Sequence, residues 1–155
     1  MEYGSIEREI YVDAAPEVVF EVVSRPEHLR EWWPDDAALD YPTPGSTGQL
    51  TFGGHGSESV FVVPLTVVES VPSRLFSFRW AYDPSVAPDR SNSFLVTLEL
   101  TPSGSGTTLR LTETGFREQG WEVAKLEEAY QDHAQGWGRF LPQLAEYVDR
   151  LVSAP

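Results

Sequence analysis

The sequence contains no cysteine, a single lysine and no long apolar run among its 155 residues. The absence of cysteine excludes disulfides, thiolate catalysis and cysteine-ligated zinc. No stretch approaches about 18 uninterrupted apolar residues, so we expect no membrane span. Residues 1–8 carry acids and no apolar run, so we expect no signal peptide and a cytoplasmic location.

Basic residues are also scarce. The chain has 24 Asp and Glu against 11 Lys and Arg, a formal net charge of −13. Nucleic acids and anionic membrane surfaces are bound through basic surfaces, so we expect neither as a partner. The apolar share of 41% and aromatic share of 12% are typical of a globular protein, and the length predicts a single domain over residues 1–155.

Standard catalytic motifs are missing as well. There is no G-x-S-x-G, P-loop, H-E-x-x-H or dinucleotide-binding glycine motif. The three histidines are scattered and predict no metal site, so we expect neither a metal nor a cofactor. Residues 53–56, Gly-Gly-His-Gly, lie between two expected strands and predict a hairpin turn and not a phosphate-binding loop.

The first third of the chain reads as a strand followed by two short helices. Apolar residues alternate from Ile6 to Val12. Asp13 is a candidate cap for a helix whose first turn holds Pro16. Ser24 and Glu27 have the spacing of a capping box and predict a second helix that ends at Pro34.

The middle of the chain has the two-residue period of strands. We expect a loop over residues 34–48, because prolines and glycines cluster there. The expected strands cover residues 49–53, 57–70, 75–82, 93–101 and 107–115. Pro64 predicts a break or bulge in the second of these. Short turns between successive strands predict an antiparallel meander.

The last third predicts one long helix. Apolar residues recur every three or four positions from Val123 to Leu151. A helix this long needs a large apolar support, which only the sheet offers. Pro142 predicts a kink near Gly138, or a break. The predicted fold is α+β: a curved antiparallel sheet of about six strands around a long C-terminal helix, with two short helices after the first strand.

Four segments resemble a known superfamily. They are residues 6–33, with Pro26-Glu27-His28-Leu29 and Trp32-Trp33; residues 68–80, ending Arg74-Leu75-Phe76-Ser77-Phe78-Arg79-Trp80; residues 106–116; and residues 133–147, with His133 to Trp137. In this order they are similar to the START/SRPBCC superfamily, and more closely to its branch of homologues of the activator of the 90-kDa heat-shock chaperone ATPase. The resemblance covers nearly the whole chain.

This resemblance implies a helix-grip fold with a cavity between the sheet and the long helix. It also implies a hydrophobic small molecule as ligand, because members of the superfamily bind such molecules. Some relatives cyclise polyketides or act on other bound ligands. The branch has no universal catalytic motif, so the resemblance transfers no catalytic residue to this sequence.

Two polar residues interrupt apolar rows. Glu113 continues the row of Leu109 and Leu111 on its strand, and His133 lies between Tyr130 and Trp137 on the helix stripe. If both face an apolar cavity, they could pair, orient a ligand or move a proton. The alternative places Glu113 at the wet end of its strand and His133 at a hydrogen-bonding boundary.

Aromatic residues supply the expected walls of the cavity. Phe78 and Trp80 share one strand face, while Trp33, Trp80 and Trp137 fit either a cavity wall or a plain core. The candidate ligand-binding residues are Trp33, Phe78, Trp80, Val96, Leu111, Glu113, His133, Trp137 and Leu141.

Three functions fit this reading. The first is the binding of a small hydrophobic or aromatic molecule by a monomer or homodimer. The second is an enzyme, such as a cyclase, dehydratase or hydrolase, that uses Glu113 and His133 in the same cavity. The third is a co-chaperone-like protein-interaction domain, for which an acidic surface would suit a basic partner. The sequence favours the first.

Overall fold

The computed structural model describes residues 3–40, 42–53 and 59–153, which form one sheet with helices on one of its faces. The strands are β1 (Ser5–Val12), β2 (Asp36–Leu39), β3 (Thr47–Gly53), β4 (Val60–Val71), β5 (Leu75–Trp80), β6 (Phe94–Ser103) and β7 (Gly106–Thr114). The helices are α1 (Pro16–Ser24), α2 (Pro26–Trp32), the 3-10 turn η1 (Arg117–Gln119) and α3 (Val123–Ser153).

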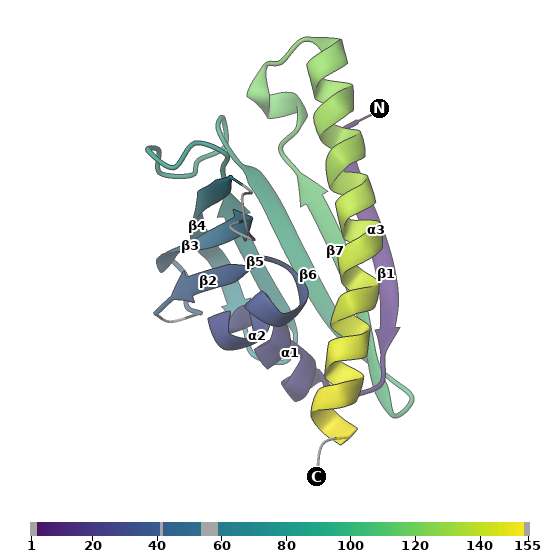
Figure 1. Cartoon of the computed structure of the whole chain (residues 1–155). Coiled ribbons are helices and arrows are strands. Elements are labelled where there is room, and N and C mark those ends of the chain that lie inside the picture. Colours follow the sequence, from purple (N-terminus) through teal and green to yellow (C-terminus); the bar gives the residue numbers. More distant parts are fainter. Residues whose placement is uncertain (1–2, 41, 54–58, 154–155) are drawn as a thin grey trace.

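The sheet is antiparallel throughout, in the order β1-β7-β6-β5-β4-β3-β2. It curves around α3, which runs along one face close to β1 and β7, while α1 and α2 lie near the C-terminal end of α3 (Figure 1). This arrangement confirms the predicted helix-grip architecture.

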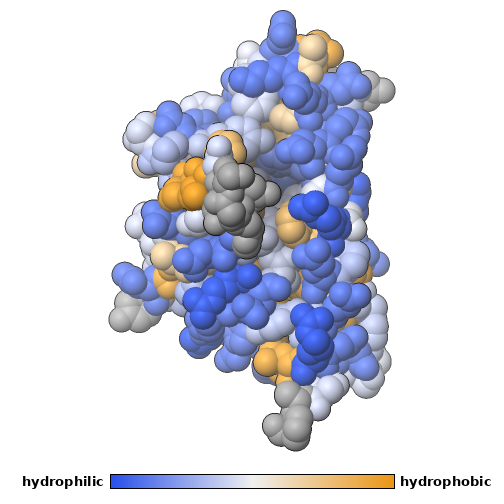
Figure 2. Space-filling view, in the orientation of Figure 1, coloured by the Kyte–Doolittle hydropathy of each residue, from blue (hydrophilic) through white to orange (hydrophobic). Residues whose placement is uncertain are grey.

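The core lies between the curved sheet and α3. Alternate residues of the central strands face it, as the two-residue period requires. Phe76 and Phe78 of β5, Val96 and Leu98 of β6, and Leu111 of β7 are all buried there. The opposite, outer face of the sheet carries the ion pair of Arg110 with Glu7. Consistent with the net charge, the face of the molecule drawn in Figure 2 is largely hydrophilic.

The starts of the two short helices differ from the sequence prediction. The N-cap of α1 is Ala15, and no side chain caps it, so the prediction that Asp13 caps this helix is wrong. The capping box is also wrong, because the Ser24 hydroxyl donates to the Phe20 carbonyl at 2.6 Å inside α1. Prolines at the first position of each helix supply the start signal instead.

The sheet has seven strands because part of the expected loop at 34–48 pairs with β3. Strand β2 has only four residues, and it lies in a segment rich in proline and glycine. Its two-residue period is therefore too short to be recognised in the sequence. The predicted irregularity at Pro64 is wrong: the register shift of β4 lies between Val67 and Glu69. Leu65 pairs with Trp80, the last residue of β5, so Pro64 has no partner residue in β5. Its missing N–H therefore interrupts no β4–β5 pair.

Within the expected turn at residues 53–56, the structure describes only Gly53, which ends β3. The other three residues of this turn lie outside the described residues, so the turn remains a prediction.

Helix α3 continues through Pro142 without a break and spans 31 residues. Its buried stripe is shorter than the apolar pattern and runs from His133 to Val148. A helix of this length measures about 46 Å, and its first turns extend beyond the buried stripe. Its first apolar residue, Val123, is therefore 70% exposed. Among the described residues, no helix is long and apolar enough to cross a membrane.

Replacing Pro142 with alanine should stabilise the protein. The new N–H could donate to the carbonyl of Gly138, which has no donor in the native helix. A proline inside a helix costs about 3 kcal/mol, whereas its stiffness in the unfolded chain returns about 1 kcal/mol. We expect Pro142→Ala to raise the free energy of unfolding by about 1–2 kcal/mol in urea titrations. Gln143→Ala, at the neighbouring exposed position, is the control; a loss of stability in Pro142→Ala would contradict this account.

Candidate functional site

The site is built around Glu113, near the end of β7. Its row places it beside Leu111 on the inner face of the sheet, where it is 0% exposed. The interpretation that placed Glu113 at the wet end of its strand is therefore wrong. The chain turns away from the sheet two residues later at Gly115, where φ is +111° and a side chain would clash with the Ser93 carbonyl.

Three N–H groups converge on the Glu113 carboxyl group. Trp80 Nε1 donates to Oε2 at 2.9 Å, Trp137 Nε1 donates to Oε1 at 2.8 Å, and His133 Nδ1 lies 2.9 Å from Oε1. An indole N–H can only donate, so both carboxyl oxygens act as acceptors. An ionised carboxylate, which has acceptors only, satisfies this arrangement, and the imidazole then donates from Nδ1.

The other ring nitrogen of His133 extends this network to Tyr82. The Tyr82 hydroxyl makes a short hydrogen bond with His133 Nε2. His133 is buried, whereas Tyr82 is 45% exposed. The three side chains therefore form a chain of hydrogen bonds that leads from a fully buried carboxylate to the hydroxyl of a partly exposed tyrosine.

Burial raises the pKa of the Tyr82 hydroxyl well above its usual range, and the negative charge of Glu113 adds to this shift. Both effects disfavour the phenolate. Tyr82 therefore keeps its proton at neutral and mildly alkaline pH.

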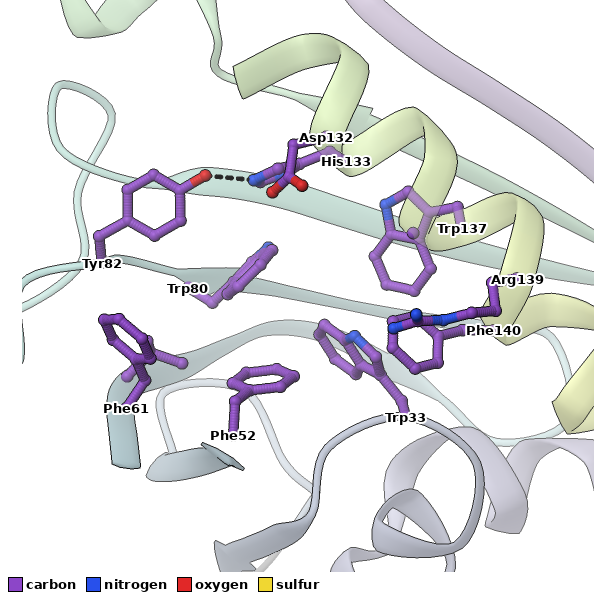
Figure 3. Close-up of a pocket in the computed structure, with 12 residues that line it drawn as sticks. Trp33, Phe52, Phe61, Trp80, Tyr82, Asp132, His133, Trp137, Arg139 and Phe140 are labelled. Carbon is purple, nitrogen blue, oxygen red and sulfur yellow. Dashed lines mark hydrogen bonds between the residues drawn. The ribbon is translucent and has the colours of Figure 1, made fainter. Parts of the chain in front are cut away.

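A pocket of about 440 Å³ opens between α3 and the β3–β5 part of the sheet, next to this network. Figure 3 shows aromatic rings on both sides of it and the Tyr82–His133 hydrogen bond at one end. The lining residues are Trp33, Phe52, Phe61, Val63, Trp80, Tyr82, Asp132, His133, Gly136, Trp137, Arg139 and Phe140.

Trp33, which follows α2, packs against the tryptophans of both walls. Its ring centroid is 4.9 Å from that of Trp137 on α3 and 5.4 Å from that of Trp80 on β5. The same two tryptophans donate to Glu113. The carboxylate thereby fixes the orientation of two rings that line the pocket.

Charged side chains are confined to the rim. Asp132 and Arg139 are exposed residues of α3 that line the pocket. The Arg139 guanidinium lies over the Phe140 ring, 4.6 Å from its centroid. Within residues 3–40, 42–53 and 59–153, no group of three or more histidine, aspartate or glutamate side chains is placed to hold a metal ion.

The candidate residues from the sequence fall into three groups. Trp33, Trp80, His133 and Trp137 line the pocket. Glu113 lies behind its wall and holds three of those residues in place. The rest are buried in the core away from the pocket lining: Phe78, Val96, Leu111 and Leu141.

Sequence reasoning missed several lining residues. The sequence predicts Tyr82 as the last residue of a strand over residues 75–82 but not as a lining residue, and in the structure it lies two residues beyond the end of β5. Its alternation with Phe78 and Trp80 was the available signal. Phe61, which is 66% exposed, and Phe140 had no such signal, because their contribution depends on how α3 lies relative to β4.

Comparison with known proteins identifies the family. The family described as Activator of Hsp90 ATPase homolog 1-like protein matches residues 13–149. The chain belongs to this family. The match confirms the resemblance found in the sequence, and a search of curated proteins finds no match.

Solved structures with the same fold come from several bacteria. Protein MLL2253 from Mesorhizobium loti is 22% identical, with a TM-score of 0.74 over 94% of this chain and 97% of that one. Protein NE0264 from Nitrosomonas europaea is 19% identical, with a TM-score of 0.74 over 99% of each chain. The Aha1 dimer from Colwellia psychrerythraea, solved in solution, is 19% identical, with a TM-score of 0.68 over 93% and 95%. At these identities the likeness shows the fold alone.

Replacing Glu113 with glutamine should destabilise the protein although the shape is kept. Whichever way the amide is turned, its NH₂ group faces at least one of the three N–H donors. Each buried donor left unpaired costs about 1–3 kcal/mol. We expect Glu113→Gln to lower the free energy of unfolding by about 2–4 kcal/mol in urea titrations.

Glu99→Gln on β6 is the matched control, because Glu99 is exposed on the outer face of the sheet. We expect it to change the free energy of unfolding by less than about 0.5 kcal/mol. Equal losses in the two variants would contradict a structural role for the buried network.

Proposed function

We propose that the protein binds a small apolar or aromatic molecule in the pocket between α3 and strands β3–β5. The observation that carries this proposal is the composition of the walls: six lining residues are phenylalanine or tryptophan, and the charged ones lie at the rim. Pockets of a few hundred Å³ with apolar walls and few polar groups are typical of small-molecule sites.

The ordering of the walls supports the same function. Trp80 and Trp137 are held by Glu113, and Trp33 packs between them. Because their side chains are fixed before a ligand arrives, little rotamer freedom is lost on binding. The helix-grip fold of the family, which commonly binds ligands in a cavity, is consistent with this interpretation.

Phe78, Val96, Leu111 and Leu141, the candidates outside the lining, would act as a packed support for the wall residues. In this proposal Glu113 positions Trp80, Trp137 and His133 and does not itself touch the ligand.

An acid–base reaction in the same pocket is a second candidate function. The hydrogen-bonded chain of Tyr82, His133 and Glu113 favours it, because such a chain can hold or move a proton next to a bound molecule. Mass spectrometry of a compound retained by the pocket would reveal a chemical change that ceases in His133→Asn. The protein-interaction role and the monomeric or homodimeric state both remain predictions.

A leucine at position 136 should block binding without loss of stability. Gly136 lines the pocket from α3, and the nearest atoms to an added Cβ belong to Phe140, at 3.8 Å. Leucine is also a better helix former than glycine, by about 0.8 kcal/mol. N-phenyl-1-naphthylamine, a neutral aromatic dye that brightens in apolar surroundings, is a suitable probe. We expect saturable fluorescence with the native protein and none with Gly136→Leu.

Gly138→Leu is the matched control. Gly138 lies on the same helix, has no atom within 4 Å of an added Cβ and does not line the pocket. This variant should bind the dye as the native protein does. Saturable binding that survives in Gly136→Leu, or no binding to the native protein, would overturn the proposed site.

A further inference from the structure

The hydrogen bonds at the polar end of the pocket run in a defined direction. What we infer from this direction rests on the proposed function. Tyr82 is the most accessible member of the chain that begins at Glu113. Its ring is fixed by Phe94, at a centroid distance of 5.2 Å, and lies nearly parallel to Trp121, at an interplanar angle of 7°. Its hydroxyl therefore has a defined place at the end of an otherwise aromatic pocket (Figure 3).

The donors around Glu113 decide which way the hydrogen bonds run. Trp80 and Trp137 can only donate, so the carboxylate accepts, and His133 donates to it from Nδ1. Nε2 of a neutral His133 then carries no proton and must accept from the Tyr82 hydroxyl. Nε2 of a protonated His133 carries a proton and donates to the Tyr82 oxygen instead.

The two states present different groups to the pocket. When His133 is neutral, the Tyr82 proton is used in the bond to His133, and only the oxygen lone pairs remain for a ligand. When His133 is protonated, the Tyr82 O–H is free to donate to a ligand. We propose that Tyr82 is the polar recognition group for an aromatic ligand that carries a carbonyl oxygen, and that the charge of His133 switches it from acceptor to donor.

In this proposal the charge of His133 drives the switch. Glu113 faces it from β7 and Tyr82 from the segment after β5, while Asp132 and Arg139 of α3 line the same pocket. The other rings packed on the imidazole, those of Trp80, Phe94 and Phe116, carry no charge. Tyr82 stays protonated, because burial raises its pKa.

A matched pair of ligands tests the switch. Fluorenone and fluorene are rigid aromatic molecules of nearly the same shape, and only fluorenone has a carbonyl oxygen. Calorimetric titrations at about pH 5.5 and about pH 8.5 would compare the two ends of the pH range in which histidine side chains in general change charge. We expect fluorenone to bind about fivefold more tightly than fluorene at the lower pH, as for one added hydrogen bond, and about equally at the higher pH.

Two variants separate the roles of the two residues. Tyr82→Phe should bind fluorenone and fluorene about equally at both pH values, so that the preference of the native protein for fluorenone at the lower pH is lost. Tyr11→Phe, at an exposed position of β1, is the matched control and should behave as the native protein. His133→Asn keeps an N–H that can donate to Glu113 but leaves Tyr82 free to donate. It should therefore prefer fluorenone about fivefold at both pH values.

Each outcome decides something. If both ligands bind and neither pH nor Tyr82→Phe changes their ratio, the switch is overturned while the binding function stands. If neither ligand binds to the native protein, both the proposed function and the switch are overturned for this ligand class. A preference for fluorenone that persists in Tyr82→Phe assigns its recognition to another group and overturns the role of Tyr82. Thermal melting of each variant shows that it is folded, and Tyr82→Phe decides the question alone if His133→Asn does not fold.

Discussion

The buried carboxylate of Glu113 is the interaction on which the rest of the site depends. An ionised group with no exposure is costly unless it is hydrogen-bonded, and here three N–H donors from β5 and α3 meet it. These bonds join the sheet to the helix that crosses it at a defined depth and rotation. Hydrogen bonds are directional, whereas the apolar contacts around them are not. They therefore select one arrangement of Trp80 and Trp137 among those that an entirely apolar core would allow.

The same carboxylate connects structure to function. The tryptophans that satisfy it form part of the pocket wall, and the histidine that satisfies it reaches the only tyrosine among the lining residues that the structure describes. The pocket therefore combines an apolar interior, suited to an aromatic molecule, with one polar end. The hydrogen bonding at that end is determined by Glu113, which lies behind the pocket wall. A neutral residue at position 113 would leave the aromatic rings but not their order.

Local periodicity explains why most of the fold could be predicted. Alternation identified the strand faces, and steps of three and four identified α3 as a helix against the sheet. The prediction failed where the signal was short or ambiguous. Strand β2 has four residues and owes its existence to pairing with β3. The prediction of a cap at Ser24 failed because the Ser24 hydroxyl donates to a carbonyl of its own helix. The sequence spacing between Ser24 and Glu27 cannot reveal this bond.

The sequence by itself determined that Glu113 and His133 interrupt apolar rows, because a row on a strand or helix follows from chain geometry alone. Only the tertiary structure decided that these residues meet, that two tryptophans complete the acceptor sites of the carboxylate, and that Tyr82 ends the chain. It also decided which aromatic residues line an open pocket and which fill the core. The reason is physical: these contacts depend on the curvature of the sheet and the position of α3 across it, which are properties of the whole packed chain.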